Sequence, residues 1–331
     1  MSTDSETKIL TYGAAMLHAI AEEMRLDKDV FLMGQMVNGG GRFKAELGLA
    51  EEFGDARVRN TNINEAFMAG CTVGAAIAGM KPIVNMRYGD FALIAADEIY
   101  HKLAKWRYMH GGQFVLSAVV ILPYGSSGGA GPEHSSSLEV FGMHFPGLKV
   151  VMPSTPADAK GLMKTAIRDP NPVLFHPVSA LAFTRGPVPT QAEFLIPFGQ
   201  AAVRRSGTSI TVVTYGSMVQ PSLDAATHLA AEGIELEVID LRTLVPLDWE
   251  AIMSSVRKTH RAMVVHEAVR TAGPGAEIAA RIQEEVFFDL EAPVSRVAGK
   301  DTIKPQTVRL EAHCIPSASD IEQAARQLMA I

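Results

Sequence analysis

The sequence predicts an α/β protein of two domains, each a largely parallel sheet flanked by helices. Strand-like apolar runs alternate with helical patterns along almost the whole chain, which is typical of βαβ units. A chain of 331 residues fits two domains at roughly 100–200 residues each. A segment rich in proline and glycine, residues 184–190, separates two series of such elements. We therefore expect the domain boundary there.

The first series of strands and helices is predicted from short apolar runs and from the helical periodicity of the segments between them. Strands are expected at Val30–Met33, Val58–Thr61, Pro82–Met86, Ala118–Pro123, Lys149–Met152 and Val173–Phe175. Helices are expected at Tyr12–Met24, Glu65–Gly79, Phe91–Arg107 and Ala157–Arg168. The last helix follows Ser154-Thr155-Pro156, where a hydroxyl cap and an early proline favour a helix start.

The second series repeats the alternation after residue 206. It predicts strands at Ile210–Thr214, Leu236–Asp240, Ala262–His266 and Val294–Val297, and helices at Val219–Ala231, Trp249–Arg257, Ala276–Phe288 and Ser319–Leu328. The sequence thus predicts a first domain over residues 8–183, a linker over 184–205 and a second domain over 206–331.

The expected helix from Glu65 to Gly79 is rich in alanine and glycine. Because glycine costs up to about 1 kcal/mol inside a helix, close packing should compensate for it. The helix could pack on its own sheet, across a subunit interface or against a cofactor. Asn62 or Asn64 could cap it, which would put Glu65 in its first turn.

Composition and charge exclude several function classes. The net charge of −6 and the absence of dense basic runs argue against nucleic acid or an anionic membrane as the main partner. The two cysteines rule out a disulfide framework and a multi-cysteine metal site. No signal-peptide pattern or membrane-spanning run is visible, so we expect a cytoplasmic protein.

Two glycine motifs give only weak indications of a functional site, and one long loop gives a stronger one. Gly125-Ser-Ser-Gly-Gly129 fits a nucleophile-elbow pattern, but no helix is predicted after it. Gly273-Pro-Gly275 could begin a dinucleotide-binding loop, yet a tight turn explains it better. The segment from Tyr124 to Phe145 is a long predicted loop, and such loops often line functional sites. His134 is its candidate proton carrier.

The chain resembles the β subunits of thiamine-diphosphate-dependent 2-oxoacid dehydrogenases, the decarboxylating first component of pyruvate, branched-chain and acetoin dehydrogenase complexes. The matching segments cover roughly residues 8–330. They include Asn62-Ile-Asn-Glu-Ala-Phe67, Lys105-Trp-Arg-Tyr-Met-His-Gly-Gly112, His144-Phe-Pro-Gly-Leu-Lys-Val-Val-Met-Pro-Ser-Thr-Pro156, Asp240-Leu-Arg-Thr-Leu-Val-Pro-Leu-Asp248 and His266-Glu-Ala268.

The resemblance implies a pyrimidine-binding domain followed by a transketolase C-terminal domain, in an α2β2 heterotetramer. The family's cofactor acid falls on Glu65, its ring-packing aromatic on Phe91 and its loop histidine on His134. A potassium ion in relatives would be held here by the backbone carbonyls of Ala166, Asp169 and Asn171. The GDG motif that holds the cofactor diphosphate through Mg²⁺ is absent from the sequence, and the family carries it on the α subunit.

The chain also departs from the family pattern. Many relatives carry Gly-Glu-Asp or Gly-Glu-Glu where this chain has Gly34-Gln-Met36, and their Thr-Pro-x-Pro-Tyr-like stretch reads Thr302-Ile-Lys-Pro305 here. We therefore expect a subunit that acts on a 2-oxoacid or acetoin and transfers an acyl group to a lipoyl acyltransferase component. The C-terminal half of a split transketolase and a non-catalytic binding subunit remain alternatives.

Overall fold

The computed structural model describes residues 6–39 and 48–331. The chain forms two compact units. The N-terminal unit comprises residues 1–124 and 141–198, and the C-terminal unit comprises residues 125–140 and 199–331. The segment 125–140, which carries His134, thus belongs to the C-terminal unit although the chain on both sides of it belongs to the other.

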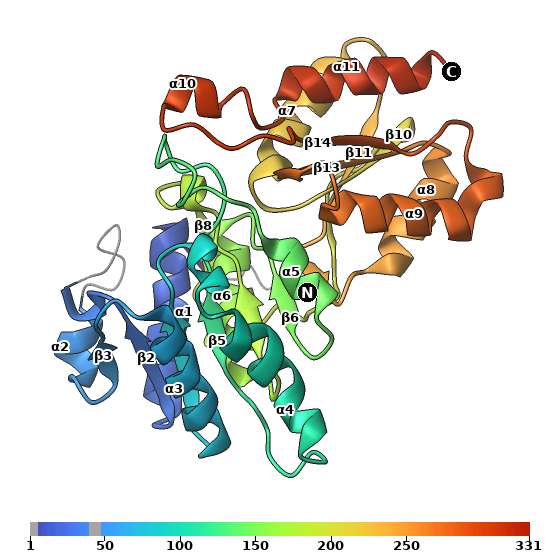
Figure 1. Cartoon of the computed structure of the whole chain (residues 1–331). Helices are drawn as coiled ribbons and strands as arrows, with labels where there is room; N and C mark the ends of the chain where they lie inside the picture. The colour runs from blue at the N-terminus through green and yellow to red at the C-terminus, as the bar shows by residue number, and fades with distance from the viewer. Residues whose placement is uncertain (1–5, 40–47) are drawn as a thin grey trace. The chain divides into compact units, whose positions relative to one another are not determined.

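The sheet of the N-terminal unit is parallel throughout, as the alternation of elements predicts (Figure 1). Its strands lie in the order β6 (Lys149–Val151), β7 (Val173–Phe175), β5 (Val119–Ile121), β4 (Lys81–Asn85), β2 (Val30–Gly34) and β3 (Val58–Asn60). Apart from the edge strand β3, in which Arg59 and Asn60 are exposed, these strands are largely buried and rich in apolar residues.

Helices cover both faces of this sheet, and alternate strand residues contact alternate layers. On one face Val30 and Leu32 pack with α1 (Tyr12–Leu26) and α6 (Pro156–Arg168). On the other, Phe31 and Met33 pack with α3 (Glu65–Ile77) and the π-helix η4 (Asp97–Leu103). The remaining helices of this unit include α2 (Leu49–Phe53) and α4 (Ala104–Met109), and α5 (Glu139–His144) begins where the chain returns to this unit.

Several features differ from the expectations, among them α5, which lies within the loop expected from Tyr124 to Phe145. The single helix expected over residues 91–107 is divided into the 3₁₀ turn η3 (Gly89–Leu93), the π-helix η4 and α4. The Gly89 amide donates to the Pro123 carbonyl at 2.6 Å, which fixes the start of the segment outside helical geometry. Within residues 184–205, β8 (Arg185–Pro189) pairs antiparallel with β1 (Thr7–Thr11), which had no strand prediction.

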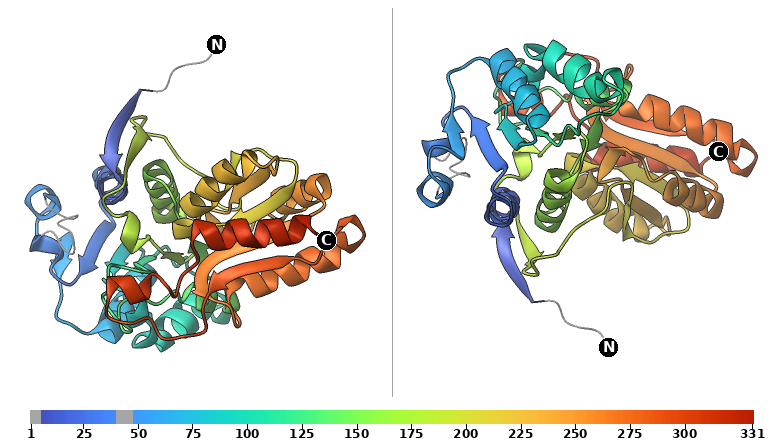
Figure 2. Two further views of the ribbon diagram at one scale, coloured as in Figure 1. Left: turned by 90° about the horizontal axis from the view of Figure 1, so that it is seen from above. Right: turned by 90° about the horizontal axis from the view of Figure 1, so that it is seen from below.

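The C-terminal unit has a second, mostly parallel sheet (Figure 2). Its order is β14 (Ser295–Gly299), β13 (Ala262–Val269), β10 (Ile210–Thr214), β11 (Leu236–Asp240) and the antiparallel β9 (Ala202–Arg205). Helices α7 (Val219–Ala230) and α11 (Ala318–Met329) cover one face, and α8 (Trp249–Thr259) and α9 (Pro274–Val286) cover the other. The remaining elements are β12 (Thr243–Val245), α10 (Val308–Glu311) and the 3₁₀ turns η6 (Gly216–Met218) and η7 (Phe287–Asp289).

The glycine motif before α9 is structural. A Cβ atom added to Gly275 would lie 2.5 Å from Nε2 of His266, so glycine allows the helix to approach β13 closely. This close packing is a structural reason for glycine at position 275. Within the described residues, no helix combines the length and apolar character needed to cross a bilayer.

Candidate active site

The topology of the N-terminal sheet marks a binding edge. The chain leaves β2 toward β3 on one side and leaves β4 toward β5 on the other. In open parallel sheets, ligands bind outside the carboxyl ends of strands where the strand order reverses in this way. Gln35 directly follows β2, Phe91 lies in η3 after β4, and Glu65 begins α3 after β3. The predicted cofactor residues of this unit thus occur at one sheet edge.

Glu65 is a buried acid at a helix start. The side chain of Asn64 accepts a hydrogen bond from the Phe67 amide at 2.9 Å, so Asn64 rather than Asn62 caps α3. Glu65 is only 4% exposed, and its Oε1 accepts from Nε2 of Gln35 at 2.9 Å. Its Oε2 accepts no hydrogen bond from the described residues. One oxygen is therefore fixed while the other is available to a ligand.

Gln35 is a site residue that could not be recognised from the sequence, where it stands out only because many relatives carry an acidic residue at this position. It is buried, and its carbonyl accepts from Nη1 of Arg87 at 3.3 Å. Arg87 has a left-handed backbone with φ of 64°, which is uncommon for a residue other than glycine. Thirty positions separate Gln35 from Glu65, so only the parallel pairing of β2 with β3 brings them together.

Phe91 lies in an apolar part of the same edge. Its ring meets that of Tyr88 edge to face, with centroids 5.5 Å apart. Leu93 and Ile94, which follow it, are 52% and 59% exposed, and Phe67 on α3 is 59% exposed. Exposed large apolar side chains beside a buried acid suit an apolar ring or a partner surface.

His134 belongs to the C-terminal unit, so the structure does not place it in one unit with Glu65 and Phe91. It is half-buried; its amide donates to the Gly131 carbonyl at 3.2 Å, and the Ser127 hydroxyl donates to the His134 carbonyl at 3.4 Å. Residues 128–138 are not helical, so Ser127 does not lie on a strand-to-helix elbow. The hydrolase interpretation of this motif therefore fails.

The same segment ends in a fully buried acid, Glu139. Its Oε1 accepts from the Tyr215 hydroxyl at 2.8 Å, and its Oε2 has no partner among the described residues. Burial raises the pKa of Glu139 to about 7, with Glu267 nearby adding to the shift. The folded protein therefore keeps this carboxyl protonated to a higher pH than it would be in the unfolded chain.

Glu139→Gln is expected to flatten the dependence of stability on pH. Since the folded pKa of about 7 exceeds the unfolded value of 4.5, the stability contributed by Glu139 is complete below pH 4.5 and is lost as pH rises to 7. The variant should therefore gain about 3 kcal/mol at pH 8 and little at pH 4. Denaturant unfolding at several pH values measures this, with exposed Glu133→Gln as control. An unchanged pH slope would contradict the protonated state.

The three carbonyls expected to bind potassium lie in the last turn of α6 and in the turn between α6 and β7. The Ala166 carbonyl accepts from the Asp169 amide at 3.3 Å, and the Asp169 carbonyl accepts from the Ser117 hydroxyl at 2.8 Å. Lys149 forms an ion pair with the Asp169 carboxylate, and Arg107 donates to the Asn171 side chain. Each carbonyl keeps a second lone pair, so the turn retains oxygen donors that suit a hard cation.

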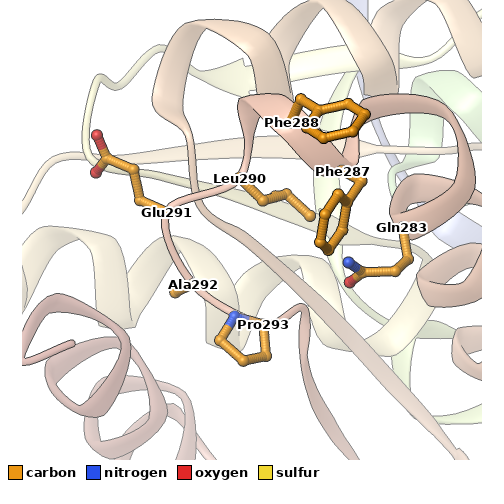
Figure 3. Close-up of a pocket in the computed structure, with 7 residues that line it drawn as sticks. All are labelled: Gln283, Phe287, Phe288, Leu290, Glu291, Ala292 and Pro293. Atoms are coloured by element: carbon orange, nitrogen blue, oxygen red, sulfur yellow. The ribbon is translucent and has the colours of Figure 1, made fainter.

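One pocket lies away from the predicted site residues. A pocket of about 450 Å³ in the C-terminal unit is formed by the turn after α9 (Figure 3), and its lining is Gln283, Phe287, Phe288, Leu290, Glu291, Ala292 and Pro293. None of the predicted site residues lines it. Across residues 6–39 and 48–331, no cluster of three or more histidine, cysteine or acidic residues could hold a metal ion.

Comparisons with known proteins agree with this architecture. Residues 8–179 match the family model "Transketolase, pyrimidine binding domain", and residues 199–321 match "Transketolase, C-terminal domain". A solved structure titled "Split gene transketolase, inactive beta4 tetramer" has a TM-score of 0.81 at 21% identity, covering 97% of this chain and 99% of that one. At this identity the likeness shows the fold alone.

Proteins of similar sequence identify the family more narrowly than the fold does. The pyruvate dehydrogenase E1 component subunit beta of Rhizobium meliloti (strain 1021) is 41% identical over 97% of this chain and 70% of that protein. The 2-oxoisovalerate dehydrogenase subunit beta of Bacillus subtilis (strain 168) is 41% identical over 97% of this chain and 98% of that protein. With both transketolase-type domains present and these relatives matched along almost its whole length, the chain belongs to the family of pyruvate and 2-oxoisovalerate dehydrogenase E1 β subunits.

Proposed function

We propose that this chain is the β subunit of a thiamine-diphosphate-dependent enzyme that decarboxylates a pyruvate-like 2-oxoacid, or cleaves acetoin, and transfers the acyl group to a lipoyl arm. The observation that carries this proposal is Glu65, buried at the start of α3 with Oε1 held by Gln35 and Oε2 open to a ligand. The names of the relatives, at 41% identity, favour a 2-oxoacid dehydrogenase over a split transketolase.

The residues at this sheet edge fit the pyrimidine end of thiamine diphosphate. Glu65 would accept or donate a proton at a pyrimidine ring nitrogen through Oε2, while Gln35 prevents the carboxyl group from rotating away. Phe91 would pack against the ring. When bound, the cofactor supplies the electron sink for decarboxylation. His134 would orient the substrate or carry charge during acyl transfer.

The proposal includes partners for the missing half of the site. An α subunit carrying the GDG motif would hold the cofactor diphosphate through Mg²⁺, in an α2β2 heterotetramer, and a lipoyl acyltransferase would accept the acyl group. We place the complex in the cytoplasm, with no nucleic-acid or membrane partner. The acidic net charge of −6 supports the absence of nucleic acid from this set.

We also propose that K⁺ binds the carbonyls of Ala166, Asp169 and Asn171. The turn after α6 would be stabilised by a cation that fits those oxygens. In 100 mM KCl the melting temperature should exceed that in NaCl or choline chloride by about 2–4 °C. Equal melting temperatures in the three salts would remove potassium from the proposal.

Affinity purification of this chain from its own cells, followed by mass spectrometry, tests the proposed function. Recovery of a chain that carries the GDG motif supports the split thiamine enzyme, and the purified complex can then be assayed with 2-oxoacids, acetoin and ketose phosphates. Turnover of ketose phosphates alone would replace it with a split transketolase. Recovery of the chain alone, inactive on every donor, would favour a non-catalytic subunit.

A further inference from the structure

The backbone of the segment carrying His134 is bound by acidic side chains of its own unit. Glu267, near the end of β13, accepts from the Ser126 amide at 2.5 Å through Oε1. Glu311, at the end of α10, accepts from the Gly129 amide at 2.8 Å through Oε2. These glutamates are 3% and 1% exposed. Charge-assisted hydrogen bonds of this kind are about twice as strong as neutral ones when water is excluded.

The segment approaches these elements so closely that two positions require glycine. A Cβ atom on Gly125 would lie 2.8 Å from Oε2 of Glu267, and one on Gly129 would lie 3.0 Å from the Val308 nitrogen. Both residues have φ near 80°, which side chains disfavour. The backbone before His134 is therefore shaped for contact with Glu267 and α10.

Lys304 binds on the other side of His134. Its Nζ donates to Oε1 of Glu267 and to the Ser135 carbonyl, at 2.7 Å each. One ammonium group thus joins the residue that follows His134 to the carboxylate that holds Ser126. The second oxygen of Glu267 accepts from the Ser217 hydroxyl at 2.6 Å. Both oxygens of Glu267 are occupied, so its orientation is fixed.

The positive charge of Lys304 compensates the buried negative charge of Glu267. Glu267 is buried, and its charge acts on the buried Glu139; burying a charge without a partner costs several kcal/mol. Lys304 is the cation paired with Glu267 in the described part of the chain. It lies in the stretch Thr302-Ile-Lys-Pro305, where the sequence departs from the family pattern.

We propose that Glu267, Lys304 and Glu311 form a clamp that positions His134 by fixing the backbone on both of its sides. All three are positioning residues, and Lys304 is the member that connects the two sides. The functional part of this inference rests on the proposed role of His134 in substrate orientation or acyl transfer. The structural part, that Lys304 orders residues 125–136, is independent of that role.

Lys304→Met in the complete complex with the α subunit tests the clamp, because methionine keeps the length of the side chain and removes its charge and donors. Hydrogen–deuterium exchange of peptides covering residues 125–136 should accelerate about tenfold. Lys304→Arg should restore most of the protection. Lys300→Met is the matched control, since Lys300 is exposed and forms no ion pair in the described residues. Unchanged exchange in Lys304→Met would overturn the clamp.

A double-mutant cycle tests whether the clamp acts through His134. Lys304→Met should lower kcat for acyl transfer about tenfold in the wild-type background and less than about twofold in His134→Ala. Equal losses in both backgrounds would mean that Lys304 supports the fold generally and would overturn the positioning role. If His134→Ala is itself fully active, the proposed function of His134 fails, and the exchange experiment alone decides whether the clamp exists.

Discussion

Glu65→Gln is expected to lower turnover of the assembled complex by about three orders of magnitude, with little effect on folding or subunit assembly. The amide keeps the shape of the side chain and can still bond to Gln35, but it cannot exchange a proton with a pyrimidine ring nitrogen. Steady-state assays with 2-oxoacids measure the loss, and calorimetry with thiamine diphosphate reports whether the cofactor still binds. Glu52→Gln, at an exposed ion pair with Arg25, is the control.

Gln35→Leu separates the orientation of the Glu65 carboxyl from its role in proton transfer. Removing the donor to Oε1 leaves the Glu65 carboxyl in place but free to rotate, so turnover should fall only about tenfold. If Glu65→Gln turns over as fast as wild type, Glu65 has no part in proton transfer, and the sheet edge between β2 and β4 loses its assigned role.

His134→Ala is expected to slow acyl transfer to a lipoyl domain about a hundredfold, while the affinity for thiamine diphosphate changes less than about twofold. The imidazole is placed on the C-terminal unit, whereas Glu65 and Phe91 belong to the N-terminal unit, so the cofactor acid does not depend on it for its local geometry. Comparing decarboxylation with an artificial electron acceptor against transfer to a lipoyl domain isolates the affected step.

His228→Ala provides the control for that experiment, because His228 is an exposed histidine paired with Glu322 on the surface of the same unit. It should leave both assays unchanged. A collapse of cofactor affinity in His134→Ala would instead mean that the segment 125–140 supports the cofactor, and the assignment of His134 to substrate or acyl transfer would be wrong.

Most local features could be predicted from the sequence. Short continuous apolar runs, separated by helical patterns, predicted the parallel strands, because a strand buried on both faces needs continuous apolar residues. Asn62 and Asn64 were both candidate caps for a helix beginning at Glu65, and the structure has Asn64 as the cap of α3. The single helix expected over residues 91–107 was wrong, because a short apolar pattern does not distinguish a continuous α-helix from a segment that changes from a 3₁₀ turn to a π-helix and then to an α-helix.

Contacts between residues far apart in the sequence depend on how the strands and segments pair in the folded chain. Gln35 and Glu65 contact each other through strand pairing across 30 positions, and Glu267 binds Ser126 across 141. Residues 125–140 join the C-terminal unit rather than the domain that surrounds them in sequence. Hydrophobic periodicity reports which face of an element is buried, but it carries no information on which buried polar group will satisfy another. The candidate residues could therefore be found from the sequence, and their partners could not.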